Sequence, residues 1–187
     1  DAHTIATMLR TEDLKPYSQP SYHLNELKSL TRYRSTLVSD CSRRKISLVR
    51  LCQILFPELK NLVPSLHMSS VYTLLSELPS ADKVAKCNLM HLTSLLSSAS
   101  KGHYGRDKAI EIREQARSSI GIRSVVKELE LQQTIELIRI LQQQIEAVEE
   151  EINSLMDDID SPITSIPGIA NRMAAVIIAE TNNFNDF

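Results

Sequence analysis

The sequence predicts an all-α protein in which long antiparallel coiled-coil helices are joined by a small helical bundle, with partial flanking domains. Aliphatic residues recur every three or four positions along two long stretches, which is the spacing of a helix that packs along one face. Long sheet-type alternation of apolar and polar residues is absent. Four Gly and no Trp among 187 residues also suit long helices with few turns.

The first seam runs from Leu131 to Ile159 and is interrupted by neither Pro nor Gly. Its positions are Leu131, Thr134, Ile138, Leu141, Ile145, Val148, Ile152, Leu155 and Ile159. An alternating three-and-four spacing kept for about four heptads is typical of helices that wrap around a partner. At roughly 1.5 Å per residue the seam extends on the order of 40 Å, so this helix needs a long partner.

The second seam belongs to a helix expected to begin near Ser21 and to end at Phe56-Pro57, because the residue before a proline disfavours the helical conformation. Its positions are Leu27, Leu30, Arg34, Leu37, Cys41, Arg44, Leu48, Leu51 and Leu55. Between Tyr22 and Phe56 seven basic residues stand against two acidic ones, a net charge of +5. Between Ser124 and Asp160 two basic residues stand against ten acidic ones, a net charge of −8.

The opposite charges favour pairing the two long helices, although burial of Leu and Ile, at roughly 1.5–3 kcal/mol per side chain, should contribute most. The sequence leaves open whether the seam closes within one chain, between chains, or both. Shorter helices are expected around this pair. They are Asp1–Arg10, Ser69–Leu78, Ala81–Cys87 capped by Ser80, Leu89–Ser98 capped by Asn88, and Arg106–Ser118 with Gly121 as its C-terminal glycine.

Composition excludes several classes of protein. Cys41, Cys52 and Cys87 lack metal-ligand spacing, and their odd number does not suit a disulfide framework, so a reducing cytoplasm is expected. No run of about 18 apolar residues and no signal peptide appears, so no membrane partner is expected. The histidines His67, His91 and His103 are scattered through the short helices, and no metal site is expected from them. The chain begins without Met, which suggests a piece of a longer protein.

Two stretches are candidates for contact with nucleic acid. The first is the basic face of the second-seam helix, with Arg43, Arg44, Lys45 and Arg50 as phosphate ligands. The alternative for the seam arginines Arg34 and Arg44 is that they reach the rim or pair with Glu of the opposing helix.

The other stretch is the turn at Gly168. A Pro-Gly turn followed by a helix with small residues on one face is how a helix-hairpin-helix motif presents backbone N–H groups to a DNA phosphate. The alternative is an ordinary turn in which Ala174 and Ala175 allow close packing. Ala170 stands where such motifs often have a second Gly, which weakens the motif.

Three segments together resemble a known family. Asp1-Ala2-His3-Thr4-Ile5-Ala6 is similar to the end of a nuclease motif, residues 30–38 and 55–59 are similar to the region after it, and Ile166-Pro167-Gly168-Ile169 through Glu180 is similar to the opening of a C-terminal domain. The family is the DEDD-type insertion-sequence transposases, which combine a RuvC-like nuclease domain, a coiled-coil region and a serine-containing transposase domain. Its members work with a structured non-coding RNA.

The resemblance implies three regions: residues 1–16 as the end of the nuclease domain, 17–160 as the coiled-coil domain, and 161–187 as the start of the C-terminal domain. It implies that Asp1 is a catalytic residue and the last of four carboxylates that hold Mg²⁺. Arg32 and Arg34 match a basic cluster of the family's coiled-coil region. The parent protein, in a bacterial cytoplasm, would be a recombinase that cuts and rejoins DNA.

This piece should be inactive alone, because one ligand of four and no nucleophile lie within it. Its expected role is that of an oligomerising spacer that binds DNA and RNA, with a homo-oligomer formed through the coiled coil. The competing interpretation is a structural coiled-coil adaptor with no nucleic-acid role. A helical enzyme with its own site in the connector lacks any constellation of acid, base and nucleophile.

Overall fold

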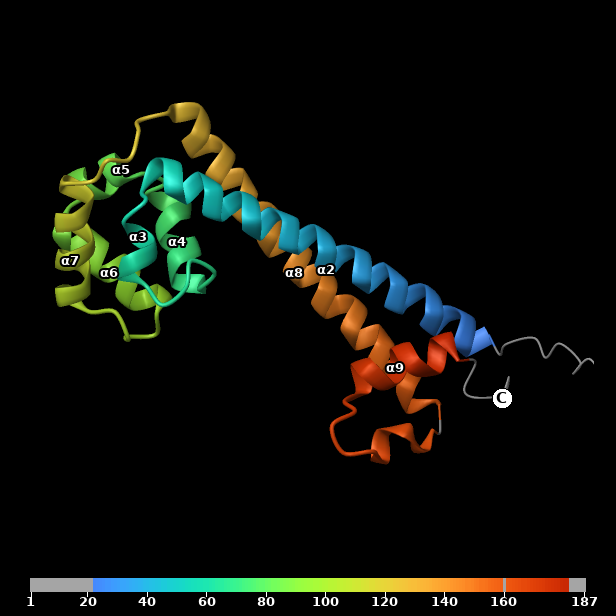
Figure 1. Cartoon of the computed structure of the whole chain (residues 1–187). Coiled ribbons are helices and arrows are strands. Elements are labelled where there is room, and N and C mark those ends of the chain that lie inside the picture. The colour runs from blue at the N-terminus through green and yellow to red at the C-terminus, as the bar shows by residue number, and fades with distance from the viewer. Residues whose placement is uncertain (1–21, 160, 182–187) are drawn as a thin grey trace, which may run out of the picture. The chain divides into compact units, whose positions relative to one another are not determined.

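The computed structural model describes residues 22–159 and 161–181, and these residues form helices and no strands. The predicted all-α class is therefore confirmed (Figure 1). The elements are α2 (Tyr22–Leu55), α3 (Leu59–Leu62), α4 (Ser69–Glu77), α5 (Ala81–Lys86), α6 (Leu89–Ala99), α7 (Arg106–Arg117), α8 (Val125–Asp157), the 3-10 helix η1 (Pro162–Ser165) and α9 (Asn171–Glu180). The helix expected at Asp1–Arg10 lies outside the described residues.

Packing divides the described chain into two compact units. The bundle unit is Ser35–Ala147, and the terminal unit comprises residues 22–34, 148–159 and 161–181. The long helices α2 and α8 contribute residues to both units, so each unit contains a segment of each long helix. This division differs from the region boundaries at 16/17 and 160/161 expected from the resemblance. The expected boundaries separate regions of family motifs, whereas the two units are separated by packing, so the expected boundaries stay a prediction.

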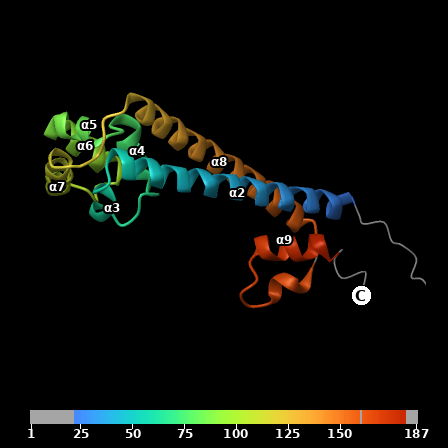
Figure 2. The ribbon, with the colours of Figure 1, turned by 45° about the horizontal axis from the view of Figure 1, so that its top comes forward.

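The bundle unit has one hydrophobic core that α2, α8 and the short helices share. Leu48, Leu51 and Leu55 of α2 are buried with Leu131 and Ile138 of α8, and buried residues of α3 to α7 complete the cluster. Figures 1 and 2 show the second half of α2 beside the first half of α8, running in opposite directions, with the short helices gathered at one end of the pair. Within this unit the expected antiparallel pair is therefore present, and its seam closes inside one chain.

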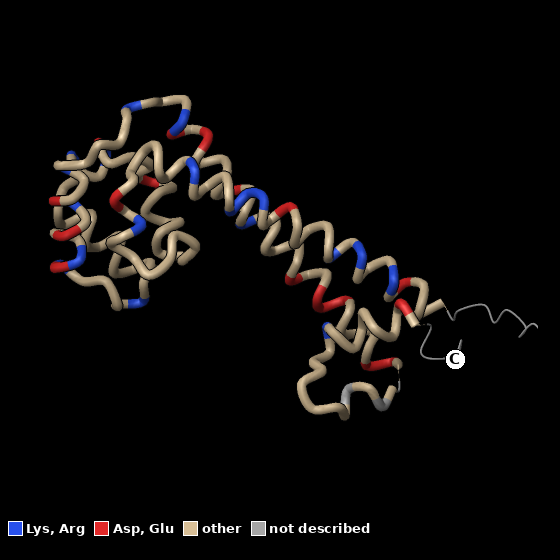
Figure 3. The backbone as a smooth tube through the Cα atoms, viewed as in Figure 1, with Lys and Arg blue, Asp and Glu red and all other residues tan. Residues whose placement is uncertain are grey.

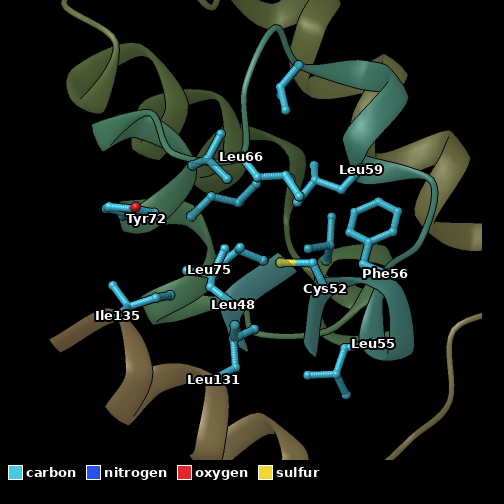
Figure 4. Close-up of a cluster of buried hydrophobic side chains, with 14 of the residues drawn as sticks. Leu48, Cys52, Leu55, Phe56, Leu59, Leu66, Tyr72, Leu75, Leu131 and Ile135 are labelled. Carbon is cyan, nitrogen blue, oxygen red and sulfur yellow. The ribbon is translucent and has the colours of Figure 1, made fainter. Parts of the chain in front are cut away.

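The buried face of α8 in the bundle unit is wider than the predicted seam. Ile135 lies outside the heptad pattern, yet it is fully buried. Figure 4 places it near Tyr72 and Leu75 of α4, which covers this side of α8. Gln132 Nε2 donates a hydrogen bond to the Ser76 carbonyl at 2.7 Å on the same side. A third helix thus turns a two-helix seam into a broader core face, and regular coiled-coil packing stays a prediction.

The caps predicted for two short helices are confirmed. The Ser80 hydroxyl accepts from the Lys83 N–H at the start of α5, and the Asn88 side chain accepts from the Met90 N–H at 2.8 Å at the start of α6. Ser80 also donates to Glu128 Oε1 of α8 at 2.6 Å, and Lys83 Nζ lies 3.0 Å from Glu128 Oε2. The cap residue therefore also ties α5 to α8.

The role predicted for Gly121 is wrong. Helix α7 ends at Arg117 with Ser118 as its C-cap, three residues before Gly121, whose φ is not positive. A Cβ at Gly121 would lie 2.4 Å from the Leu55 carbonyl oxygen, and the next N–H, of Ile122, donates to the Ile54 carbonyl at 2.9 Å. Glycine is needed here because the connection into α8 passes directly against the end of α2.

The terminal unit has a separate core made by three helices. Leu24 and Leu27 of α2, Ile152 and Met156 of α8, and Ile178 of α9 are buried together. Ala174 and Ala175 of α9 have no exposed surface. Their small size lets the α9 backbone approach the other two helices, so these residues have the packing role that the sequence suggested.

None of the helices in the described part of the chain is both long and apolar enough to cross a membrane.

Candidate nucleic-acid interface

The exposed basic residues of α2 in the bundle unit do not share one face. Arg43 and Arg50 are seven residues apart, which is about two helical turns, so they lie on one face, opposite the buried Leu48 and Leu51. Arg44 is turned about 100° away from Arg43. Figure 3 shows these cations as the basic segment of α2 in this unit. We name the surface of Arg43 and Arg50 the arginine face.

The arginine face keeps most of its positive charge available. Arg43 pairs with Asp40 on the same helix, but its side chain is still 71% exposed. Arg44 and Arg50 are exposed, and neither forms an ion pair with any residue that the structure describes. Exposed ion pairs such as Arg43–Asp40 are worth under about 1 kcal/mol, so a phosphate could displace the carboxylate at small cost.

Lys45 is directed toward the bundle rather than toward the arginine face. Lys45 is half-buried. The burial of His67 and the nearby positive charge of Lys45 both lower the pKa of His67. The His67 Nδ1 atom lies 3.1 Å from the Tyr72 hydroxyl of α4. The structure thus separates Lys45 from the arginines with which the sequence grouped it.

Arg32, in the terminal unit, is held by a carboxylate of α9. Its Nε and Nη2 atoms donate to Oε1 and Oε2 of Glu180, both at 3.0 Å, and Lys28 Nζ lies 3.4 Å from the same carboxylate. These hydrogen bonds and the opposite charges raise the pKa of Arg32 and lower the pKa of Glu180. A two-pronged pair of this kind orients the guanidinium as well as balancing its charge.

Arg34 makes the more buried contact of the terminal unit. Its Nε donates to Glu149 Oε1 of α8 at 2.7 Å, and Arg172 Nη1 of α9 donates to the same oxygen at 3.1 Å. Glu149 therefore joins α2, α8 and α9 of this unit. The pairing is the alternative that the sequence offered for Arg34, with a Glu of the opposing helix as the partner. For both Arg32 and Arg34, contact with phosphate stays a prediction.

We expect Glu149→Gln to weaken the terminal unit by about 1–2 kcal/mol at pH 7 and to reduce its acid sensitivity. Burial alone would raise the pKa of Glu149, but hydrogen bonds from Arg34 and Arg172 outweigh burial and lower it below its ordinary value of 4.5. A lowered folded-state pKa contributes stability above the unfolded-state pKa, and that stability is lost as the pH falls through the folded-state value. Urea unfolding at pH 7 and pH 3 measures both effects.

The control for this substitution is Glu150→Gln. Glu150 is the next residue of α8, is exposed, and makes no ion pair within the described chain. Equal losses in the two variants at pH 7, or an unchanged difference between pH 7 and pH 3 in Glu149→Gln, would contradict the role given to Glu149.

The turn at Gly168 has the backbone of a type II turn. The Ile169 N–H donates to the Ile166 carbonyl at 3.1 Å, Pro167 occupies the second position, and Gly168 has a φ of +92°. Helix α9 begins three residues later, and its N-cap residue Ala170 makes no side-chain capping bond. The segment from Gly168 to Arg172 is mostly exposed. Exposed N–H groups at a helix start suit an anion, so Gly168 keeps its predicted role as a proposal.

The described residues do not supply a metal site. No group of three or more His, Cys, Asp or Glu among them could hold an ion, and Cys41, Cys52 and Cys87 are free thiols. Asp1, the catalytic and metal-binding residue that the resemblance implies, lies outside the described residues. No step of metal chemistry can therefore be built from the part of the chain described.

These features define an all-α chain with two candidate phosphate-binding surfaces, the arginine face and the Gly168 turn. A family model described as a transposase, that of the DEDD type in IS110 elements, matches residues 1–57, which include the whole of α2. Residues 1–57 of the chain therefore match this family of DEDD-type transposases. No curated protein matches it in a sequence comparison. The family acts on DNA and typically uses a divalent metal.

Sequence reasoning missed Glu149 and Glu180 as the partners of Arg34 and Arg32, and Arg172 as the second cation at Glu149. The partners of Arg34 and Arg32 are 115 and 148 residues away along the chain. Charge segregation between the long helices was the one available signal. It indicated that acidic and basic segments pair, but it could not indicate which residues meet, because α9 supplies both Glu180 and Arg172.

Proposed function

We propose that this chain is the internal portion of a transposase that cuts and rejoins DNA during movement of an insertion sequence, and that its helices form an oligomerising, nucleic-acid-binding spacer. One observation carries the proposal. The family match extends from Asp1 to Pro57 and so joins the nuclease motif to α2, the helix with the arginine face. We propose that α2, which follows this motif in the sequence, lies close to the DNA that the nuclease region cuts.

In the whole protein, Asp1 would be one of four carboxylates that hold Mg²⁺, whose role is to organise the phosphodiester reaction. The other three carboxylates and the serine nucleophile implied by the resemblance lie outside these 187 residues. This portion therefore binds and positions rather than cleaves. A structured non-coding RNA would select the DNA sequence and would present phosphates that the arginine face can also bind.

The arginine face suits a nucleic-acid backbone in three ways. Arg43 and Arg50 are separated by roughly 10 Å along the helix, so both can reach one stretch of phosphates. Guanidinium groups match phosphate geometry with two parallel hydrogen bonds. The acidic residues Glu26 and Asp40 are outnumbered along α2, which favours approach of a polyanion.

We expect the double variant Arg43→Glu and Arg50→Glu to weaken binding to duplex DNA or structured RNA by more than about tenfold at 100 mM salt. Loss of two phosphate contacts should also reduce the slope of log affinity against log salt by about 2. Fluorescence anisotropy across a salt series measures both quantities.

The matched control is Arg106→Glu with Arg117→Glu on α7. Arg117 pairs with Glu114 three residues away, as Arg43 pairs with Asp40, and Arg106 is exposed without an ion pair to any described residue. The control changes net charge equally, so it should keep most of the binding. Equal losses in the two double variants would remove the arginine face from the proposal.

A structural coiled-coil adaptor without a nucleic-acid role is the second candidate function. One observation favours this candidate. The charges of Arg32 and Arg34 are already neutralised by ion pairs with Glu180 and Glu149. In that case the unmodified chain would bind neither duplex DNA nor structured RNA at low salt, and the salt series above would show no affinity to lose.

A further inference from the structure

Helix α8 has a second apolar face in the bundle unit, on the side opposite its buried residues. Val126, Leu129, Leu137 and Ile140 are 72%, 54%, 43% and 43% exposed. Gln133 is exposed at the centre of the same stripe. Buried Leu131, Ile135 and Ile138 lie on the other side of the helix. No charged residue belongs to the stripe, although charged residues make up 24% of the chain. We name these five positions the outer stripe.

The spacing of the residues in the outer stripe is the same when it is counted from either end of the helix. Its members are separated by three, four, four and three residues, so the spacing is symmetric about Gln133. A two-fold axis that relates two antiparallel copies of a helix requires this symmetry, because each residue must meet the residue equally far on the other side of the axis. A stripe that binds an unrelated partner has no reason to be symmetric.

We infer that a second copy of this chain docks on the outer stripe, with the two α8 helices antiparallel and the two-fold axis passing at Gln133. Leu129 of one copy then packs against Leu137 of the other, and Val126 packs against Ile140. The inference rests on the oligomerisation included in the proposed function and names the surface that performs it. Within each unit the predicted seam of α8 is occupied by α2 of the same chain.

The polar residue at the centre of the outer stripe favours the same arrangement. The Gln133 side chain carries both donors and an acceptor, so it can hydrogen-bond to its own copy across the axis. A single polar residue at the centre of an apolar contact defines register.

The size of the contact predicts a weak dimer. From Val126 to Ile140 the outer stripe extends roughly 20 Å along the helix. A contact of this length is at the small end of specific interfaces, so a weak dimer is expected. The dimer would therefore form at high local concentration, for example when two chains are held on one DNA.

Sedimentation of the 187-residue chain from about 1 to 200 µM measures the dimer directly. We expect Leu129→Glu to weaken the dimer about a hundredfold, because the two-fold axis places two carboxylates in the contact. Circular dichroism should show unchanged helicity, since Leu129 is exposed. The matched control is Gln142→Glu, which adds the same charge at an exposed position of α8 outside the outer stripe, and it should dimerise normally.

Cysteine cross-linking tests the orientation. In a Cys87→Ser background, with Cys41 and Cys52 buried, Val126→Cys and Ile140→Cys should form a disulfide when the two variants are mixed. Neither variant should cross-link efficiently alone. Efficient self-cross-linking of Val126→Cys would establish a parallel pair and overturn the inference.

The outcomes separate this inference from the proposed function. A dimer that persists in Leu129→Glu would overturn the outer stripe as the interface while oligomerisation stands. A chain that stays monomeric at 200 µM would overturn both the inference and the proposed oligomerisation. Nucleic-acid binding is measured separately with the Arg43 and Arg50 variants, so it stands or fails independently.

Discussion

Replacing Leu131 by Asp is expected to unfold the bundle unit at neutral pH. Leu131 is fully buried among Leu48 of α2 and the short helices. The substitution removes the transfer free energy of a buried leucine and leaves a carboxylate without a partner in the core. The combined loss of about 4–6 kcal/mol is comparable with the whole stability of a typical domain.

Hydrogen exchange measured by mass spectrometry reports this loss segment by segment. We expect amide protection to disappear from α4, α6 and α7, whose helices share the core with Leu131. The control is Ile46→Asp, which adds the same charge at a position of α2 that is 70% exposed. Retained protection of α4 to α7 in Leu131→Asp would contradict the single shared core.

Replacing Ile178 by Asp is expected to have the second-largest effect, in the terminal unit. Ile178 of α9 is fully buried with Leu27 and Ile152. The substitution should lower the free energy of unfolding by about 4 kcal/mol. It should also detach α9, which packs into this core mainly through Ile178 and its buried alanines. The ion pairs of Glu180 with Arg32 and of Arg172 with Glu149 would be lost with it, because Glu180 and Arg172 hold their positions only while α9 is docked.

The matched control for Ile178 lies two residues away on the same helix. Val176 is 47% exposed, so Val176→Asp should leave the unit folded. Exchange protection of α9 provides the readout in both variants. If α9 stays protected in Ile178→Asp, the terminal unit does not depend on the core described here, and its ion pairs would have to hold α9 in place.

The candidate phosphate-binding arginines of α2 differ in what a phosphate must displace. At the arginine face, Arg50 forms no ion pair with the described residues, so a phosphate can pair with its charge directly. At Arg32 and Arg34, a phosphate must first break carboxylate pairs that tie α2 to α9 and α8. Binding there would loosen the terminal unit, whereas binding at the arginine face would not.

Much of the local structure was determined by the sequence alone. Heptad spacing and the absence of Pro predicted α2 and α8 within a few residues, because a long apolar stripe can be buried only if the helix continues. Ser80 and Asn88 marked the starts of α5 and α6, since a cap bond needs only residues two or three positions away. The small Ala174 and Ala175 correctly indicated close packing of α9.

Only the tertiary structure decided which distant residues meet. The burial of Ile135 depends on α4 covering one side of α8, and the requirement for Gly121 depends on the carbonyl of Leu55. The partner of Arg32 comes from α9, and the partner of Arg34 comes from α8. The same periodic pattern in α8 contains both a buried seam and an exposed outer stripe. Local sequence cannot separate them, because exposure is determined by the neighbouring elements.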